Sequence, residues 1–358
     1  MNCGGTCTTT QGSDPANCGS CGHGCLGGSC SGGACQRWTV ANSAVTSNPT
    51  YLAADATNVY WTDNGLHSVL QVPVSTAGAT PVTLVNNSLL VYFQGIVVNG
   101  STLAFTTDDS AILTTASLWT ARVGVANQTL SPLDTFAGSS NPGTVSGPVF
   151  NSSGTTIYIL EDPEDSSGNH TTNTTLYACP SGSANACAIL TTVAANSLGG
   201  PVVSGNSVFF DDYSHNAVEQ FSLPSGPLNG TYVSPIPTSP TIMAADSSRI
   251  YFAYNGDGTG TTVTTEGIVN NSTNGSAQPQ GFANTTGNAT GLASDGKFLY
   301  FAWVNYNNSP PTGAIQYASV TGGVVQNLYT GSQPRAVVAA NGGVYWIDGT
   351  SIYGQRFP

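Results

Sequence analysis

Acidic residues recur where apolar, aromatic-rich segments end, and their type and spacing best suit ligand chemistry. They are Asp63, Asp108, Asp109, Glu161, Asp162, Asp211, Asp212, Asp257 and Asp348. If these segments are equivalent strands of a repeated unit, the carboxylates form a ring on one face, which could bind Ca²⁺ or a cationic ligand. The structural alternative, which we favour, is that each acid caps its turn or accepts backbone hydrogen bonds from the next unit. No D-x-[DN]-x-[DN]-G loop supports calcium.

His215 lies in the stretch that best suits acid–base or metal chemistry, since DDYSH at 211–215 combines two acids, a tyrosine and a histidine. The acidic run 161–165, followed by His170, could also serve a metal or an acid–base pair, but its polar neighbours favour a solvated loop. No G-x-S-x-G or H-E-x-x-H motif is present, so we predict no catalytic residues and no resident metal. The candidate ligand-binding residues are Asp63, Asp108, Asp162, Asp211, Asp212, His215 and Asp348.

Nine cysteines form the other set with chemistry of its own. Seven have the spacing C-x3-C-x10-C-x2-C-x3-C-x4-C-x4-C, and two follow far along the chain. They are Cys3, Cys7, Cys18, Cys21, Cys25, Cys30 and Cys35, then Cys179 and Cys187. Such density in a short Gly-rich segment predicts disulfides and an oxidising compartment. Cys18, Cys21 and Cys25 could instead bind a metal together with His23, but the second half of a zinc-type ligand set is missing.

The cysteine count leaves the pairing open. Because seven is odd, one thiol between residues 3 and 35 is free, paired with an upstream cysteine lost by trimming, or paired with another molecule. Cys179 and Cys187 bracket a short loop, so we expect a local disulfide there. No signal peptide is visible before Cys3, and we interpret the chain as a mature or trimmed secreted protein.

From residue 36 onward one pattern recurs seven times: an apolar strand, a tight polar turn, and a strand that ends in aromatic residues and often an acid. The instances are 52–63, 96–108, 148–162, 202–212, 243–257, 292–305 and 337–348. The aligned aromatic residues are Tyr60, Phe105, Tyr158, Phe209, Tyr251, Tyr300 and Tyr345. They are 42 to 53 residues apart, and a third, alternating strand and a weaker fourth follow. This period is typical of a β-propeller.

The last repeat indicates how the array of repeats closes. It ends at Pro358 after three strands, whereas residues 36–45 form an orphan strand ahead of the first repeat. Pairing the two parts completes the last unit and removes exposed sheet edges. We therefore predict an all-β fold: a seven-bladed β-propeller at 36–358 with N-to-C strand closure, preceded by a disulfide-stapled arm at 1–35.

Composition excludes several classes of function. Charged residues make up 7% of the chain, with 6 Lys+Arg against 18 Asp+Glu and a formal net charge of −12. Nucleic-acid binding needs a Lys/Arg footprint that six scattered cations cannot build. No run of apolar residues is long enough to predict a transmembrane helix.

Two stretches resemble known families. YWTD at 60–63 and YWID at 345–348 resemble the signature of low-density-lipoprotein-receptor-type propellers, which implies a propeller with a binding role. That family has six blades, whereas seven repeats are counted here, so the resemblance implies no particular ligand. TQGSDPANCGSCGHGC at 10–25 is similar to the Cys-rich leaders of propeller-like secreted proteins in myxobacteria, which implies location rather than activity.

We predict a secreted or cell-surface, non-catalytic binding or scaffold protein whose propeller presents loops to a protein or glycan ligand. Trp119, Trp303 and Tyr306 could stack on sugar rings, although packing between blades is the alternative for most of them. No cofactor is expected, except that the acids could bind Ca²⁺.

Two other hypotheses stay open. The odd cysteine suggests a structural subunit of an extracellular assembly that self-associates through the Cys-rich arm. A lyase or hydrolase is the third hypothesis, because a seven-bladed lyase class that opens streptogramin rings works with a histidine and a bound metal. Asp212 and His215 are the residues on which that hypothesis depends.

Overall fold

The computed structural model describes residues 2–3, 6–7, 12–88, 90–108, 115–137, 141–164, 173–194, 199–212, 214–223, 228–233, 240–247, 249–255, 261–267, 280–285 and 287–357. Within these ranges every regular element is a strand, and no helix long and apolar enough to cross a membrane is found. The strands form seven sheets of four or five strands and two sheets of two strands. The prediction of an all-β fold is confirmed.

Each larger sheet takes its strands from one stretch of the chain, with a single exception in the last sheet. The first sheet has β6 (Pro49–Ala54), β7 (Asn58–Asp63), β8 (Ser68–Pro73) and β9 (Val82–Asn86). The second has β10 (Val91–Asn99), β11 (Thr102–Asp108), β12 (Thr115–Arg122) and β13 (Asp134–Ala137). The third has β14 (Asn141–Val145), β15 (Val149–Phe150), β16 (Thr156–Glu164), β17 (Thr174–Pro180) and β18 (Ala188–Val193).

The remaining four sheets follow the same order. The fourth has β19 (Val202–Ser204), β20 (Ser207–Asp212), β21 (Ala217–Ser222) and β22 (Leu228–Val233), and the fifth has β23 (Pro240–Ala245), β24 (Arg249–Asn255), β25 (Thr261–Gly267) and β26 (Gln280–Asn284). The sixth has β27 (Asn288–Ser294), β28 (Phe298–Asn305), β29 (Thr312–Ser319) and β30 (Gln326–Gly331). The seventh has β31 (Pro334–Ala340), β32 (Gly343–Asp348), β33 (Ser351–Arg356) and β5 (Trp38–Ala41).

The second strand of each sheet carries the aligned aromatic residue, and all seven of these residues are buried. In β7, five consecutive residues after Asn58 are buried, because neighbouring sheets cover both of its faces. Tyr60 packs with Phe105 of the next sheet, whereas Trp61 packs with Tyr345 and Ile347 of the last sheet. The hydrophobic core therefore lies between sheets, and successive residues of one strand serve opposite neighbours.

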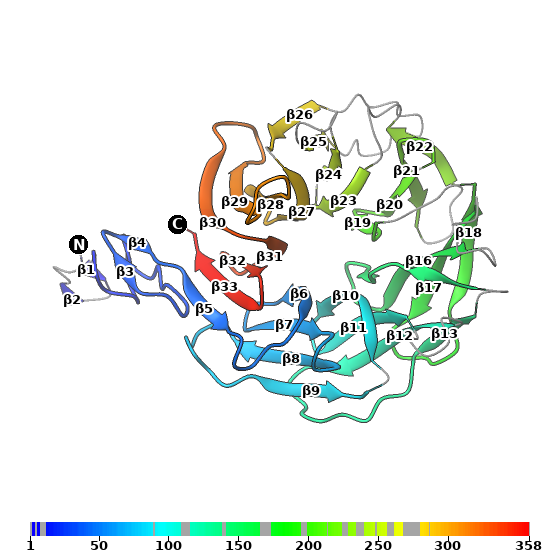
Figure 1. The fold of residues 1–358 in the computed structure, drawn as a ribbon, viewed down its shortest axis with the longest axis horizontal. Coiled ribbons are helices and arrows are strands. Elements are labelled where there is room, and N and C mark those ends of the chain that lie inside the picture. The colour runs from blue at the N-terminus through cyan, green and yellow to red at the C-terminus, as the bar shows by residue number, and fades with distance from the viewer. Residues whose placement is uncertain are drawn as a thin grey trace.

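The sheets are arranged in a ring (Figure 1). First strands such as β6, β10, β23 and β31 face the centre, and fourth strands such as β9, β18 and β26 lie at the outside (Figure 1). The two ends of the chain meet at one side of the ring (Figure 1). Each sheet therefore presents one edge strand to the axis and the opposite edge strand to the rim.

The seventh sheet joins the two ends of the chain. β5 pairs antiparallel with β33, where Trp38 opposes Gly354 and Ala41 opposes Ile352. The Trp38 ring packs edge-on against Tyr345, with ring centroids 6.1 Å apart. The expectation that the N-terminal orphan strand completes the last repeat is confirmed.

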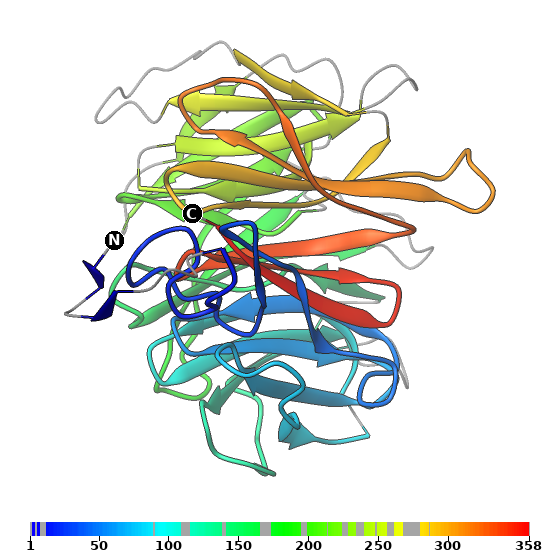
Figure 2. The same ribbon diagram turned by 90° about the vertical axis from the view of Figure 1, so that its left-hand side faces the viewer.

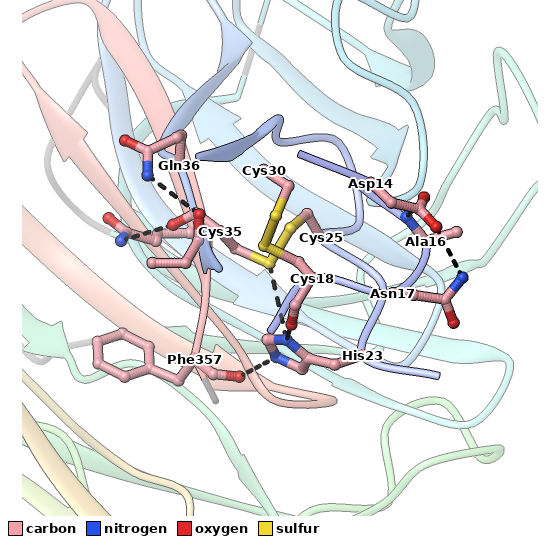
Figure 3. The surroundings of a disulfide bond; sticks show 12 residues. Asp14, Ala16, Asn17, Cys18, His23, Cys25, Cys30, Cys35, Gln36 and Phe357 are labelled. Atoms are coloured by element: carbon pink, nitrogen blue, oxygen red, sulfur yellow. Dashed lines mark hydrogen bonds between the residues drawn. A yellow bond between two sulfur atoms is a disulfide. The ribbon is translucent and has the colours of Figure 1, made fainter. Parts of the chain in front are cut away.

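The Cys-rich segment leads into β5. Its regular structure is two short hairpins, β1 (Asn2–Cys3) with β2 (Thr6–Cys7) and β3 (Cys30–Ser31) with β4 (Ala34–Cys35). Cys18–Cys30 and Cys25–Cys35 form disulfides (Figure 3). Another disulfide joins Cys179 to Cys187. Cys21 is also disulfide-bonded, whereas the side chains of Cys3 and Cys7 lie outside the described part of the chain. The odd thiol stays a prediction.

Candidate functional site

The candidate ligand-binding residues gather on one side of the ring, which we call the front face. It is the side on which each first strand begins and each second strand ends, as the register shows where Pro49 opposes Asp63 and Pro334 opposes Asp348. The orange turn between β28 and β29 and the red turn between β32 and β33 project on this side, at the right of Figure 2. The opposite side, which carries the turns between first and second strands, is the back face.

Asp63 shows how the front-face carboxylates are used. It is fully buried, and its two oxygens accept hydrogen bonds from the backbone N–H groups of Ser47 and Asn48, each at 2.9 Å. The same carboxylate accepts from the N–H groups of Gly65 and Leu66, each at 3.0 Å. One side chain therefore ties the segment that enters the sheet to the turn after its second strand.

Two other sheets repeat this arrangement. Asp348 accepts hydrogen bonds from the N–H groups of Gln333, at 2.7 Å, and Ser332, at 3.3 Å. Asp211 is fully buried, and both of its oxygens lie 3.1 Å from the N–H nitrogen of Gly199. The donors again precede the first strand of the sheet. These contacts are the turn-capping role of the structural alternative, and they use the carboxylates inside the protein.

Asp108 and Asp162 are buried as well, with exposed fractions of 9% and 1%. Gln94 Nε2 donates to Asp108 Oδ2, and burial together with the Asp108 charge raises the pKa of Tyr51. Asp162 opposes Thr144 where β14 pairs with β16. Four other residues that the sequence singled out, Asp109, Asp165, His170 and Asp257, lie outside the described residues.

Asp212 and His215 form a dyad on the front face. His215 Nδ1 lies 2.7 Å from Asp212 Oδ2, and the Ser214 hydroxyl donates to Asp212 Oδ1 at 2.7 Å. The carboxylate is buried, whereas 63% of the His215 side chain is exposed. Because the carboxylate holds Nδ1, Nε2 is the nitrogen that could exchange a proton with a ligand or bind a metal.

A second repeated acid, which the sequence analysis missed, lies on the back face. The Tyr60 hydroxyl donates to Asp55 at 2.6 Å. Asp246 with Tyr251 (2.6 Å) and Asp295 with Tyr300 (2.9 Å) repeat this contact in two other sheets. The signal was present in the sequence, because in each case the acid precedes the aligned tyrosine by five residues.

These pairs raise the pKa of the tyrosine, and in the first sheet they also shift the pKa of the acid. Burial raises the pKa of Tyr251 to about 12, and the Asp246 carboxylate adds to the shift. Burial also raises the pKa of Asp55, but hydrogen bonds from Tyr60, Thr57 and Asn58 outweigh it, so that the pKa lies below its usual value. The back-face carboxylates therefore anchor the buried tyrosines that line the core.

Three of the exposed apolar and aromatic side chains lie on the front face. Leu66 follows β7, Tyr92 is the second residue of β10, and Tyr306 follows β28, with exposed fractions of 37%, 55% and 56%. The two tryptophans considered for sugar stacking are engaged in the fold: Trp119 Nε1 donates to Thr107 Oγ1, and Trp303 Nε1 donates to Gln316 Oε1, each at 2.9 Å. Tyr306 is the exposed member of that group.

A cavity of about 840 Å³ lies on the ring axis. First strands of all seven sheets, or the segments just before them, line it, from Thr50 in the first sheet to Val338 in the seventh. Small residues let the strands approach one another, since a Cβ atom on Gly95 would lie 2.4 Å from the Gly147 Cα atom. Arg335 is the one charged residue among the described residues that line the cavity.

The Cys-rich arm docks on the end of β33. His23 lies between two carbonyl oxygens, with Nδ1 2.8 Å from Cys18 O and Nε2 2.8 Å from Phe357 O (Figure 3). The sulfurs of Cys18, Cys25 and Cys35 lie within 4.8 Å of one another, but all three belong to disulfides. Their proximity therefore reflects two stacked bridges, and the contacts of His23 are those of an anchor between arm and ring.

Comparison with solved structures identifies the architecture. A streptogramin B lyase structure matches with a TM-score of 0.61 over 90% of this chain and 98% of its own, at 11% identity. The β-propeller domain of Myceliophteria thermophila Cps50 (Swd1) matches with a TM-score of 0.60 over 90% and 100%, at 7% identity. A chain of a mitotic checkpoint complex matches at 0.57 over 90% and 94%, at 10% identity.

These likenesses bear on the fold alone, because all three identities are low. No family model and no curated protein matches the chain. The shared architecture shows that the chain has the fold of a β-propeller.

Proposed function

We propose that this chain is a non-catalytic binding protein of an oxidising, extracellular compartment. In this proposal the seven sheets are the blades of one closed propeller at 36–358, and residues 1–35 form a separately stapled arm. The disulfides support the compartment, because such bonds persist outside the reducing cytosol. The ligand binds on the front face.

The exposure pattern of the front face carries the proposal. The repeated acids there are buried or, at Asp348, half-buried and accept hydrogen bonds from the protein itself, whereas Leu66, Tyr92 and Tyr306 are exposed. Exposed tyrosines offer a flat apolar surface with a polar tip, which suits a sugar ring or a protein surface. Tyr306 favours the glycan, because it stands among Asn305, Asn307 and Asn308, whose amides can recognise hydroxyl groups.

A glycan array with the purified chain tests this proposal. We expect at least one class of glycan to bind, and Tyr306→Ala to reduce the binding about tenfold, as expected for the loss of a stacking contact at the centre of a site. Val324→Ala is the matched control, since Val324 is 82% exposed in the turn between β29 and β30 on the back face. If the chain binds proteins but no glycan, the ligand is a protein. If Tyr306→Ala and Val324→Ala lose glycan binding equally, the site is not at Tyr306.

The Asp212–His215 dyad favours a second candidate function, that of a lyase or hydrolase. The dyad orients an exposed imidazole, and a structurally similar propeller is described as a streptogramin B lyase. Incubation with streptogramin B, followed by mass spectrometry, tests it. If turnover is seen and the double variant Asp212→Asn, His215→Ala retains it, the reaction does not use this dyad; if no turnover is seen, this candidate loses its support.

A further inference from the structure

The axial cavity is lined, among the described residues, by a single charged side chain. The chain carries a net charge of −12, yet the one charged residue among the described residues that line the cavity is a cation, Arg335. Its Nη2 donates to Pro49 O at 2.9 Å and to Gly349 O at 3.2 Å, which fixes the guanidinium at the junction of the last and first sheets. Two contacts of one nitrogen leave the other N–H donors of the guanidinium for a ligand.

The surroundings of Arg335 do not neutralise it by direct contact. Within the described ranges no carboxylate forms a salt bridge with it, and the acid that faces it, Asp348, accepts hydrogen bonds from Tyr329, Ser332 and Gln333. Burial lowers the pKa of Arg335, while the charges of Tyr306 and Asp348 oppose that shift. An arginine remains cationic under such conditions, so a partly desolvated positive charge lines the cavity.

The lining changes character along the axis. On four first strands a polar lining residue near the front face is followed two residues later by an apolar one, and a register shift of the strand lies between the two. The polar members are Thr50, Gln94, Thr290 and Arg335, and the apolar members are Leu52, Ile96, Leu292 and Val337. The cavity is therefore polar and cationic at its front end and apolar below.

We propose that the axial cavity binds a small amphiphilic molecule with one carboxylate or similar anionic group and an apolar body. The anionic group pairs with Arg335 at the front end, and the apolar body lies farther along the axis, beside the strand segments that carry Leu52, Ile96 and Val337. The volume of about 840 Å³ lies within the range of small-molecule pockets and is too small for a folded partner. Charge complementarity selects the anion, because a cationic head would meet the guanidinium in a site of low dielectric.

Calorimetric titration with three probes that share a ten-carbon chain tests this proposal. They are decanoate, decanol and decyltrimethylammonium, used below their micelle-forming concentrations. We expect saturable binding of one decanoate per chain, at least about tenfold tighter than binding of the other two probes, because a charge-assisted hydrogen bond is lost with either of them. Hexanoate should bind more weakly than decanoate, since less apolar surface is buried.

Variants locate the binding on Arg335. Arg335→Gln should weaken decanoate at least about tenfold, whereas Arg335→Lys should keep most of the preference for the anion. Arg122→Gln, at an exposed arginine at the end of β12, is the matched control and should bind like the parent. Absence of binding, equal affinity for the three probes, or an unchanged Arg335→Gln variant would each overturn the proposal. If Arg335→Gln does not fold, the probe series and Arg335→Lys still decide. Because Tyr306 interacts electrostatically with Arg335, both variants are tested with both ligands: loss of decanoate binding alone in Arg335→Gln and loss of glycan binding alone in Tyr306→Ala would keep the two proposals separate.

Discussion

The two faces of the ring use the same residue type for different tasks. In the first sheet, Asp63 on the front face is fully buried and accepts four backbone hydrogen bonds, two of them from the segment that enters the sheet. Asp55 on the back face is partly exposed and accepts from the Tyr60 hydroxyl and from N–H groups of its own turn. In the first sheet, therefore, the front-face acid ties the connection that enters the sheet to the turn after its second strand, whereas the back-face acid closes one hairpin.

This difference separates architecture from function in a repeat protein. Acids that recur in several sheets are occupied by hydrogen bonds that every sheet needs. Side chains that occur in only one sheet, such as Arg335 in the cavity and Tyr306 on the front face, are not part of the repeated hydrogen bonding. They can therefore serve a function that the other sheets do not share. The search for a site in this fold is therefore a search for departures from the repeat.

The largest effect is expected from Asp63→Ala. It removes four backbone hydrogen bonds to one buried carboxylate, so the free energy of unfolding should fall by roughly 3 kcal/mol. Urea titration followed by tryptophan fluorescence measures this loss. A loss below about 1 kcal/mol would mean that Asp63 does not hold the connection before β6 and the turn after β7 together.

Tyr251→Phe is expected to cost less, about 1.5 kcal/mol, because it removes a single hydrogen bond to a carboxylate. The raised pKa of Tyr251, about 12, sets the pH dependence. The folded state binds the phenolic proton more tightly than the unfolded state, so this stabilisation is complete below pH 10 and is lost as the pH rises from about 10 to 12. The stability gap between parent and variant should therefore shrink over that window, and a constant gap would contradict the assignment.

Asp55→Ala should have a smaller effect still, about 1 kcal/mol, because solvent can replace part of the acceptor at this partly exposed turn. The urea experiment on Asp63→Ala serves as its reference. If Asp55→Ala proves as costly as Asp63→Ala, the distinction between the two faces fails.

The smallest effect is expected on stability at acidic pH. The lowered pKa of Asp55 means that its stabilising contribution is present above about pH 4 and is lost as the pH falls through the lowered value. Asp55→Asn should therefore reduce the dependence of stability on pH in that acidic window and leave it unchanged near neutrality. Unfolding curves collected from pH 2 to pH 7 check this, and an identical pH dependence in both proteins would count against the turn contacts of Asp55.

The sequence was sufficient to predict the strands, but it was not sufficient to predict which side chains and loops surround them. The aligned aromatics predicted the buried second strands, and the orphan segment 36–45 predicted the partner of β33. The position of Asp63 at a strand end could be predicted as well. Its burial could not, because its donors Ser47 and Asn48 belong to the connection before the repeat and carry no pattern of their own.

Arg335 was missed for a related reason. Its significance depends on which side chains the other first strands place on the axis, and that emerges only when all seven sheets are assembled. The Asp55–Tyr60 contact, by contrast, was accessible, since the five-residue spacing recurs in two further repeats.

Pairing of β5 with β33 has a consequence for how the chain is made. A hydrogen bond from Gln355 to Cys35 O in this region spans 320 residues, so the seventh sheet is the one that cannot form until nearly the whole chain has been synthesised. Until then, the neighbouring sheets lack a partner on one side and expose apolar strands. Contacts of such long sequence separation slow folding, because loop closure precedes the stabilising contacts. The rate at which the two ends of the chain find each other should therefore limit the yield of folded protein.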